Sequence, residues 1–224
     1  PPASILNRKQ LIMRIAPIVT ALALSFALLP PVAAQSASSA KAAPAAATST
    51  EDLAKSLANP IAALISVPFQ LNYDRDIGPA DEGSRWLMNF QPVVPIDLNA
   101  DWNMISRTIV PVIRQDDVFP GAGSQFGLGD TVQSLFFSPK APTADGVIWG
   151  VGPVLLLPTG TDELLSSEKW GLGPTGVVLR QAGPWTYGLL ANHLWSVAGT
   201  SSRPDVNSTF LQPFVSYTTP EALT

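Results

Sequence analysis

The single histidine of the chain, His193, is the residue that could most readily serve catalysis. Asn192 precedes it and Ser196 follows three positions later, so the residue types of a lipid hydrolase lie close together. Neighbours on a β-strand point to opposite faces, however, and Asn192 is then badly placed to orient the His193 ring. The pattern predicts that His193 is structural and that the chain has no catalytic residue. The alternative is a lipid-modifying enzyme that uses His193.

Two arginines could recognise solutes by charge. Arg85 shares one face of a predicted strand with Asn89 and Gln91, and Arg107 lies in the next predicted strand. If these strands cross a bilayer, an arginine facing lipid at mid-depth would cost about 2–4 kcal/mol, so both should point inward. There they either pair with an acid such as Asp130 or line a pore that selects solutes. The predicted pore-lining residues are Arg85, Asn89, Gln91, Arg107 and Asp130.

Two further motifs match known chemistry only loosely. Residues 171–176 fit the dinucleotide pattern G-x-G-x-x-G, but a strand-like run follows them and no strand–helix–strand unit surrounds them. Asp162, Glu163 and Glu168 form an acidic cluster that could bind calcium or bridge lipopolysaccharide through divalent ions. The cluster lacks the ligand spacing of a defined site. We therefore predict no cofactor and no metal, and expect solvated acidic loops.

The composition excludes several classes of protein. The chain has 224 residues, of which 46% are hydrophobic and only 13% charged, whereas ordinary globular proteins have about 25% charged residues. It contains no cysteine, which excludes disulfides, thiolate metal sites and thiol nucleophiles. Its net charge of -4 argues against a nucleic-acid partner, because such a partner requires a basic surface.

The N-terminus has the features of an export signal. Met13 and Arg14 precede an apolar run over residues 15–29, and small residues precede a predicted cut after Ala34. The run is shorter than the roughly 20 residues of a membrane-spanning helix. The sequence therefore predicts a signal peptide over residues 1–34, with residues 1–12 as a candidate upstream extension of the gene.

Residues 35–50 are rich in alanine, serine, proline and threonine and are predicted to form a disordered linker. A short periplasmic helix is predicted within residues 51–63, since Ser49 is a suitable N-cap and acids occupy the first turn. We expect this helix on the surface, with a plug or a periplasmic lid as the alternative.

From Leu64 onward the chain shows the period-two pattern of long β-strands. Between Ser84 and Ile96 alternate residues form an oily face, and the other face is mixed and more polar. Trp185 and Trp195 share a face and are about 33 Å apart along the strand, at roughly 3.3 Å per residue. For a strand tilted near 45°, the height between them matches that of the apolar band of an outer-membrane barrel. The eight predicted strands are 64–73, 84–96, 101–113, 127–138, 146–158, 172–182, 184–197 and 207–219. The predicted lipid-facing or aromatic-girdle residues are Trp86, Phe90, Trp149, Trp185, Tyr187 and Trp195.

The connections and the charges support the same interpretation. Long and short predicted connections alternate, as they do in outer-membrane barrels. Prolines such as Pro92 and Pro111 fall inside predicted strands and must lie at rims, bulges or local breaks. Charge is rare in the predicted strands, as desolvation in lipid requires. The charged residues within them are Arg85, Asp101, Arg107, Asp130 and Arg180.

Five stretches carry a resemblance to a known family: LANPIA (57–62), LISVPFQ (64–70), FQPVVP (90–95), GLGD (127–130) and FFSP (136–139). They resemble bacterial outer-membrane β-barrel transporters of the phenol-degradation meta-pathway type, some of which bear the misleading label neuromedin U. The similarity runs from about Leu53 to the end of the chain. It implies an outer-membrane barrel for uptake of small hydrophobic or aromatic compounds, without established catalytic residues. Such barrels end on an aromatic residue after further strands, whereas this chain ends at Thr224.

Together these observations predict an all-β fold, an antiparallel up-and-down transmembrane β-barrel over residues 64–224. The barrel is expected to be a C-terminally incomplete fragment, with about twelve strands in the full protein. The predicted function is an outer-membrane channel or transporter for passive movement of small solutes in a Gram-negative bacterium. A sealed structural barrel with interacting loops is an alternative, beside the His193 enzyme. The predicted partners are outer-membrane lipid, lipopolysaccharide, the barrel-assembly machinery and the solute.

Overall fold

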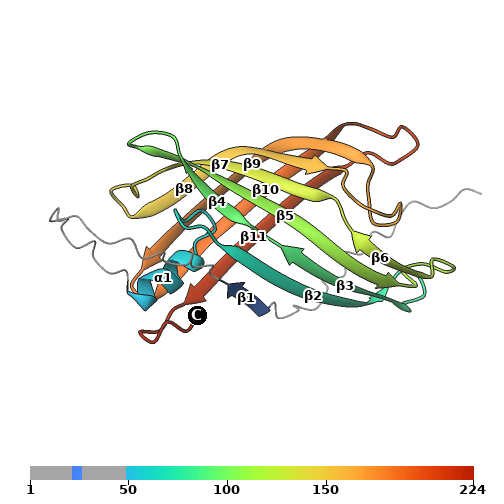
Figure 1. Ribbon diagram of the computed structural model, residues 1–224, viewed down its shortest axis with the longest axis horizontal. Coiled ribbons are helices and arrows are strands. Elements are labelled where there is room, and N and C mark those ends of the chain that lie inside the picture. Colours follow the sequence, from blue (N-terminus) through green and yellow to red (C-terminus); the bar gives the residue numbers. More distant parts are fainter. Residues whose placement is uncertain (1–21, 27–48) are drawn as a thin grey trace, which may run out of the picture.

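A computed structural model of the chain describes residues 22–26 and 49–224 (Figure 1). The described strands form one antiparallel sheet in the order β1-β2-β3-β5-β7-β8-β9-β10-β11, and the short strands β4 and β6 each pair with β5. The sheet is strongly curled, and no pairing among the described strands joins β11 to β1 or β2, so it is an open half-barrel. Its strands are β1 (Leu22–Phe26), β2 (Val67–Ile77), β3 (Gly83–Phe90), β4 (Val93–Asp97), β5 (Trp102–Asp116), β6 (Ser124–Leu128), β7 (Thr131–Pro139), β8 (Val147–Leu157), β9 (Lys169–Ala182), β10 (Trp185–Gly199) and β11 (Asn207–Tyr217).

The all-β, antiparallel prediction is confirmed, but two of the eight predicted strands are interrupted. The predicted strand 84–96 divides into β3 and β4 at Pro92, which has no amide hydrogen to donate to β5. The preceding amide, that of Gln91, donates to the carbonyl oxygen of Pro68 at 2.9 Å and so continues the β2–β3 register past the break. The predicted strand 127–138 divides into β6 and β7, and there the amide of Gly129 donates to the carbonyl oxygen of Pro111. Prolines thus lie at both breaks.

The long strand β5 bridges both breaks. Its first half pairs with β4 on one side and β7 on the other, and its second half pairs with β3 and β6. The sheet therefore remains continuous across each interruption. Among residues 22–26 and 49–224 no strand pairing closes the sheet into a complete barrel.

Most of the predicted signal peptide (1–34) and linker (35–50) lies outside the described residues. Within the predicted signal peptide, the described backbone of β1 pairs antiparallel with β2, in the register Leu22↔Leu71 to Phe26↔Val67.

Helix α1 (Thr50–Leu57) begins after Ser49, whose hydroxyl accepts a hydrogen bond from the Asp52 amide at 3.0 Å. An ion pair between Glu51 and Lys55, four residues apart, supports the helix. The helix lies at one end of the half-barrel, close to the C-terminus (Figure 1). There the side chain of Gln181 in β9 donates to the carbonyl oxygen of Lys55. The helix thus contacts the sheet, although none of its own residues is fully buried.

A hydrophobic core fills the concave side of the sheet near α1. Ile61, which follows the helix, is buried there against strands from both halves of the sheet. The inner face is therefore mixed, because at this end the curled sheet encloses apolar side chains. The cluster comprises Ile61, Val93, Ile105, Phe136, Val177, Leu179 and Leu190.

The loops are less sharply sorted by length than predicted. One end of the sheet carries loops 78–82, 117–123, 158–168 and 200–206, and the other carries 98–101, 140–146 and 183–184. The longest loop, 158–168, and the shortest, 183–184, lie at opposite ends as expected. Loops 117–123 and 140–146 are equally long, because β5 and β6 extend further than their predicted ranges. The strict alternation of long and short loops is therefore not observed.

Candidate functional site

A chain of polar side chains crosses the concave face beside the core. Arg107 Nη2 donates to Gln91 Oε1 at 2.6 Å, and Gln91 Nε2 donates to Gln70 Oε1 at 2.9 Å. We call Gln70, Gln91 and Arg107 the Arg107 cluster. Gln91 is only 5% exposed, so its two hydrogen bonds fix which of its ends faces the guanidinium group. Asn89 lies opposite Gln70 in the register of β2 and β3.

A second polar group lies on the same face, towards the longer loops. Arg85 Nε donates to Gln115 Oε1 at 3.1 Å, and Gln115 Nε2 donates to Gln125 Oε1 at 3.0 Å. The side chain of Gln115 is fully buried. Gln115 and Gln125 are not among the predicted site residues, because both lie beyond the ends of the predicted strands 101–113 and 127–138, whereas the structure extends β5 and β6 to include them. In the described part of the chain neither Arg85 nor Arg107 forms an ion pair, so the expected pairing with Asp130 is not observed.

Asp130 holds the longest loop to the sheet. One carboxylate oxygen accepts hydrogen bonds from the Gly160 amide and the Ser166 hydroxyl, and the other accepts from the amide and hydroxyl of Ser167. The distances range from 2.6 to 3.1 Å. The structure therefore separates Asp130 from the Arg107 cluster and places it under loop 158–168. Its observed contacts are those of a loop anchor.

Replacing Asp130 with asparagine should loosen this loop. An amide keeps one acceptor oxygen but loses the charge and at least one hydrogen bond, and hydrogen bonds to charged groups contribute about 1.5–3 kcal/mol each. We expect a loss of about 1.5 kcal/mol in unfolding free energy, together with faster amide hydrogen exchange in residues 158–168. Asp145→Asn is the matched control, because Asp145 lies in an exposed turn. Equal exchange in the two variants would contradict the anchoring role.

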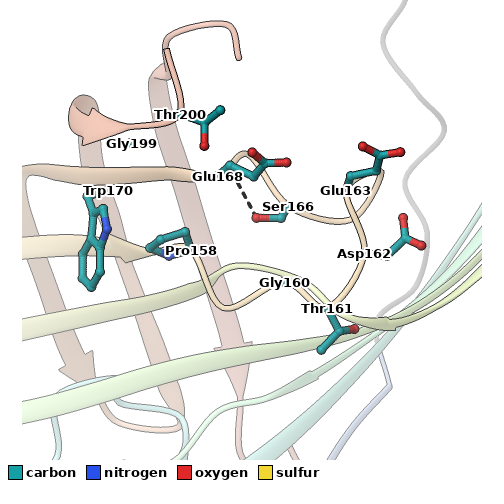
Figure 2. A pocket seen from close by; sticks show the side chains of 10 residues that line it. All are labelled: Pro158, Gly160, Thr161, Asp162, Glu163, Ser166, Glu168, Trp170, Gly199 and Thr200. Atoms are coloured by element: carbon teal, nitrogen blue, oxygen red, sulfur yellow. Dashed lines mark hydrogen bonds between the residues drawn. The ribbon is translucent and has the colours of Figure 1, made fainter. Parts of the chain in front are cut away.

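Loop 158–168, the start of loop 200–206 and the adjoining ends of β9 and β10 border a shallow, open pocket of about 560 Å³ (Figure 2). Glu168, in the predicted acidic cluster, is engaged there by Arg203 at 2.9 Å, and its amide donates to the Ser166 hydroxyl (Figure 2). Asp162 accepts from the amide of Leu164. Within residues 22–26 and 49–224 no three His, Cys, Asp or Glu side chains are placed to hold a metal ion. The acids of this pocket therefore serve the loop's own structure.

Loop 200–206 is fastened by Asp205. Its carboxylate accepts hydrogen bonds from Lys169 Nζ and from Ser196 Oγ, each at 3.0 Å. The hydrogen bonds from Lys169 and Ser196, together with the positive charge of Lys169, hold the pKa of Asp205 below its ordinary value of 3.8. The Lys169 side chain is only 8% exposed, whereas Asp205 is open to solvent. The carboxylate thus provides the counter-charge of a nearly buried amine.

This lowered pKa predicts a pH-dependent stability. The folded state favours ionised Asp205, so its contribution is fully present above the unfolded pKa and is lost as the pH falls through the lower folded pKa. Asp205→Asn should therefore have a lower urea midpoint than the parent protein at pH 6, and the difference should vanish towards pH 2. Glu221→Gln, at an exposed position, is the control. A difference that is constant with pH would show that charge is not involved.

The convex face of the sheet is apolar and rich in aromatic side chains. Trp86, Trp185, Tyr187 and Trp195 are exposed, the last three on one face of β10, while Phe90 and Trp149 are half-buried. Because the buried core lies on the concave side, these exposed rings lie on the convex side. Several form cross-strand pairs, such as Tyr73 with Trp86 at 4.4 Å and Trp185 with Tyr217 at 4.9 Å between ring centroids.

His193 lies on this convex face and does not assemble a hydrolytic site. Its Nδ1 is 2.7 Å from Thr209 Oγ1, and its ring packs against that of Trp195 in a tilted arrangement with the centroids 4.1 Å apart. Ser196 belongs to the opposite face of β10, where its hydroxyl donates to Asp205. The G-x-G-x-x-G stretch, residues 171–176, lies within β9 and opens no helix. The described residues therefore do not bring together a nucleophile, a base and an orienting group around His193.

Comparison of the chain with family models, curated proteins and solved structures finds no match. The resemblance to outer-membrane transporters therefore rests on the five quoted stretches alone. What the structure shares with that expectation is the large curled antiparallel sheet. In the described segments no helix is long and apolar enough to cross a membrane.

Proposed function

We propose that this chain forms the wall of an outer-membrane β-barrel that lets small solutes cross passively. The observation that carries the proposal is the distribution of side chains across the curled sheet. Large apolar residues are exposed on the convex face of strand after strand, for example Leu71, Met88, Val151 and Val197. Soluble monomers rarely expose contiguous apolar patches of more than a few hundred Å², and larger ones mark surfaces that contact lipid or another protein. Lipid is the solvent that suits such a face.

The concave face supports a route for solutes. The Arg107 cluster and the Arg85–Gln115–Gln125 group follow one another along the inner wall, and both consist of hydrogen-bonding groups. Polar interiors of this kind are typical of outer-membrane barrels. Helix α1 and Ile61 narrow the inner space at one end. A route past them favours selective passage of small molecules over a wide aqueous pore.

A sealed structural barrel is the second candidate, and the buried cluster around Ile61 is the observation that favours it. Apolar packing across the concave face can close the lumen altogether. In that case the loops at the far end, with their anchors Asp130 and Asp205, carry the function as contact surfaces. The two candidates differ in solute flux, not in location.

The test uses the full chain expressed with its export signal in a Gram-negative host. Cell fractionation and the heat-dependent gel mobility of the purified protein show whether it folds in the outer membrane. Swelling of liposomes that contain the protein then measures the flux of small neutral and charged solutes. We expect outer-membrane location and flux above that of empty liposomes. Location in the membrane without flux would favour the sealed barrel, and recovery in the soluble fraction would refute both.

A further inference from the structure

A cavity of about 530 Å³ lies between α1, the inner wall and strands β2 and β11. Its volume falls in the range of pockets for small organic ligands, about 300–1,000 Å³. Leu57 from α1, Leu190 from β10 and Phe214 from β11 contribute apolar surface. The Arg107 cluster contributes the opposite wall, since Gln70, Gln91 and Arg107 all border the cavity. The lining therefore combines the Arg107 cluster with apolar patches, and further hydrogen-bonding groups, among them Asn59 and Gln212, border the cavity between them.

Arg107 is the only charged side chain among the residues that line the cavity in the described part of the chain. Of its donor groups, Nη2 is engaged by Gln91, and no carboxylate lies within ion-pair distance in the described residues. A guanidinium group has five N–H donors in a planar fork that matches a carboxylate. Arg107 is half-buried, so water satisfies it less well than it would at an open surface.

The neighbouring amides fix the direction of the arginine. Gln91 uses its NH₂ group on Gln70 and therefore presents its oxygen to Arg107. This oxygen holds one edge of the guanidinium without neutralising its charge. The pair Gln70–Gln91 thus positions an uncompensated cation at the cavity wall, which is the arrangement expected for an anion-binding group.

We infer that the cavity binds a small amphipathic monocarboxylate, with the carboxylate on Arg107 and the apolar body against Leu57, Leu190 and Phe214. Inorganic anions lack an apolar body to occupy the remaining surface, and neutral apolar molecules leave Arg107 without a counter-charge. The further step of identifying this ligand with the transported solute rests on the proposed function. The binding itself does not require transport and can be measured separately.

The test measures equilibrium dialysis of 4-ethylbenzoate and its neutral analogue 4-ethylbenzamide against the purified full chain in detergent micelles, with protein-free micelles as the blank. The two probes have nearly the same shape and differ in charge at pH 7. We expect the carboxylate to bind at least tenfold more tightly than the amide. Equal binding of the two probes, or binding of neither, would overturn the inference without any variant.

Variants locate the preference. Arg107→Gln should abolish the preference for the carboxylate, and Arg107→Lys should retain part of it. Gln91→Glu keeps the shape of the side chain but places an acid against Arg107, so it should also abolish the preference and does not depend on removing the arginine. Arg180→Gln is the control, because Arg180 is exposed on β9 and does not line the cavity. A preference that survives in both Arg107→Gln and Gln91→Glu would overturn the assignment.

The binding result and the flux result can fail independently. A preference for the carboxylate in micelles without flux in liposomes would sustain the site and refute the transporter. Flux of neutral solutes without a preference for the carboxylate would sustain the transporter and refute the site.

Discussion

Gly173→Ala should destabilise the sheet by about 3 kcal/mol, at the upper end of the usual cost of overpacking. A Cβ atom at this position would collide with the carbonyl oxygen and carbon of His193 in β10, closer than side chains approach in real proteins. Both atoms belong to the backbone of the adjacent strand, so no rotamer change can relieve the contact. The strands β9 and β10 would have to separate locally, with loss of neighbouring ladder hydrogen bonds.

Gly176→Ala is the matched control for this prediction, because it makes the same change three residues further along β9. There an added Cβ would meet Val151 Cγ1 at 3.6 Å and the carbonyl oxygen of Gly150 at 3.8 Å, which are ordinary contacts. Alanine also reduces the freedom of the unfolded chain, so this variant should be neutral or slightly more stable. Urea midpoints of both variants decide the matter. Similar losses in both would show that glycine is needed along β9 for another reason.

The alternation of side chains made much of this sheet predictable. On β10 the odd-numbered face was assigned outward and the structure exposes Trp185 (48%) and Trp195 there, while Leu190 on the other face is buried. Side chains on a strand alternate between its two faces, so the sequence assigns each residue of β10 to a face once the strand itself is known. The strand breaks were harder to predict. Pro92 and Pro111 reveal where an amide hydrogen is missing, but Pro153 and Pro174 lie within the unbroken strands β8 and β9, so a proline alone does not predict a break.

The polar contacts depended on register, which the sequence does not show directly. Arg107 meets Gln91 because β4 and β5 pair with Val93 opposite Arg107, and a shift of one residue would turn the arginine to the other face. Asp130 illustrates the same difficulty over a longer range. Its carboxylate binds Ser166 and Ser167, in a loop whose path no local pattern predicts. Asp130 was predicted to line the pore or to pair with an arginine, and its observed contacts are those of a loop anchor.

Val151→Arg should cost about 2–4 kcal/mol of folding free energy in a bilayer, and it tests the orientation of the whole sheet. Val151 lies near the middle of β8, 52% exposed on the convex face, with Phe137 and Gly176 opposite it in the neighbouring strands. If this face contacts lipid, the guanidinium group must be buried in hydrocarbon or drag water and headgroups towards the bilayer centre. If the face contacts water, the same substitution is a surface change worth less than about 0.5 kcal/mol.

The two outcomes are separated by folding the variant into liposomes and measuring its urea-dependent unfolding against the parent protein. Ala144→Arg is the control, because it adds the same side chain to an exposed residue of turn 140–146, beyond the end of the strand. Val151→Leu keeps the site apolar and should change little. A loss confined to Val151→Arg would assign the convex face to lipid, since only a nonpolar solvent penalises a charge there while tolerating leucine. Equal stability of the two arginine variants would place that face in water and remove the basis of the proposed membrane function.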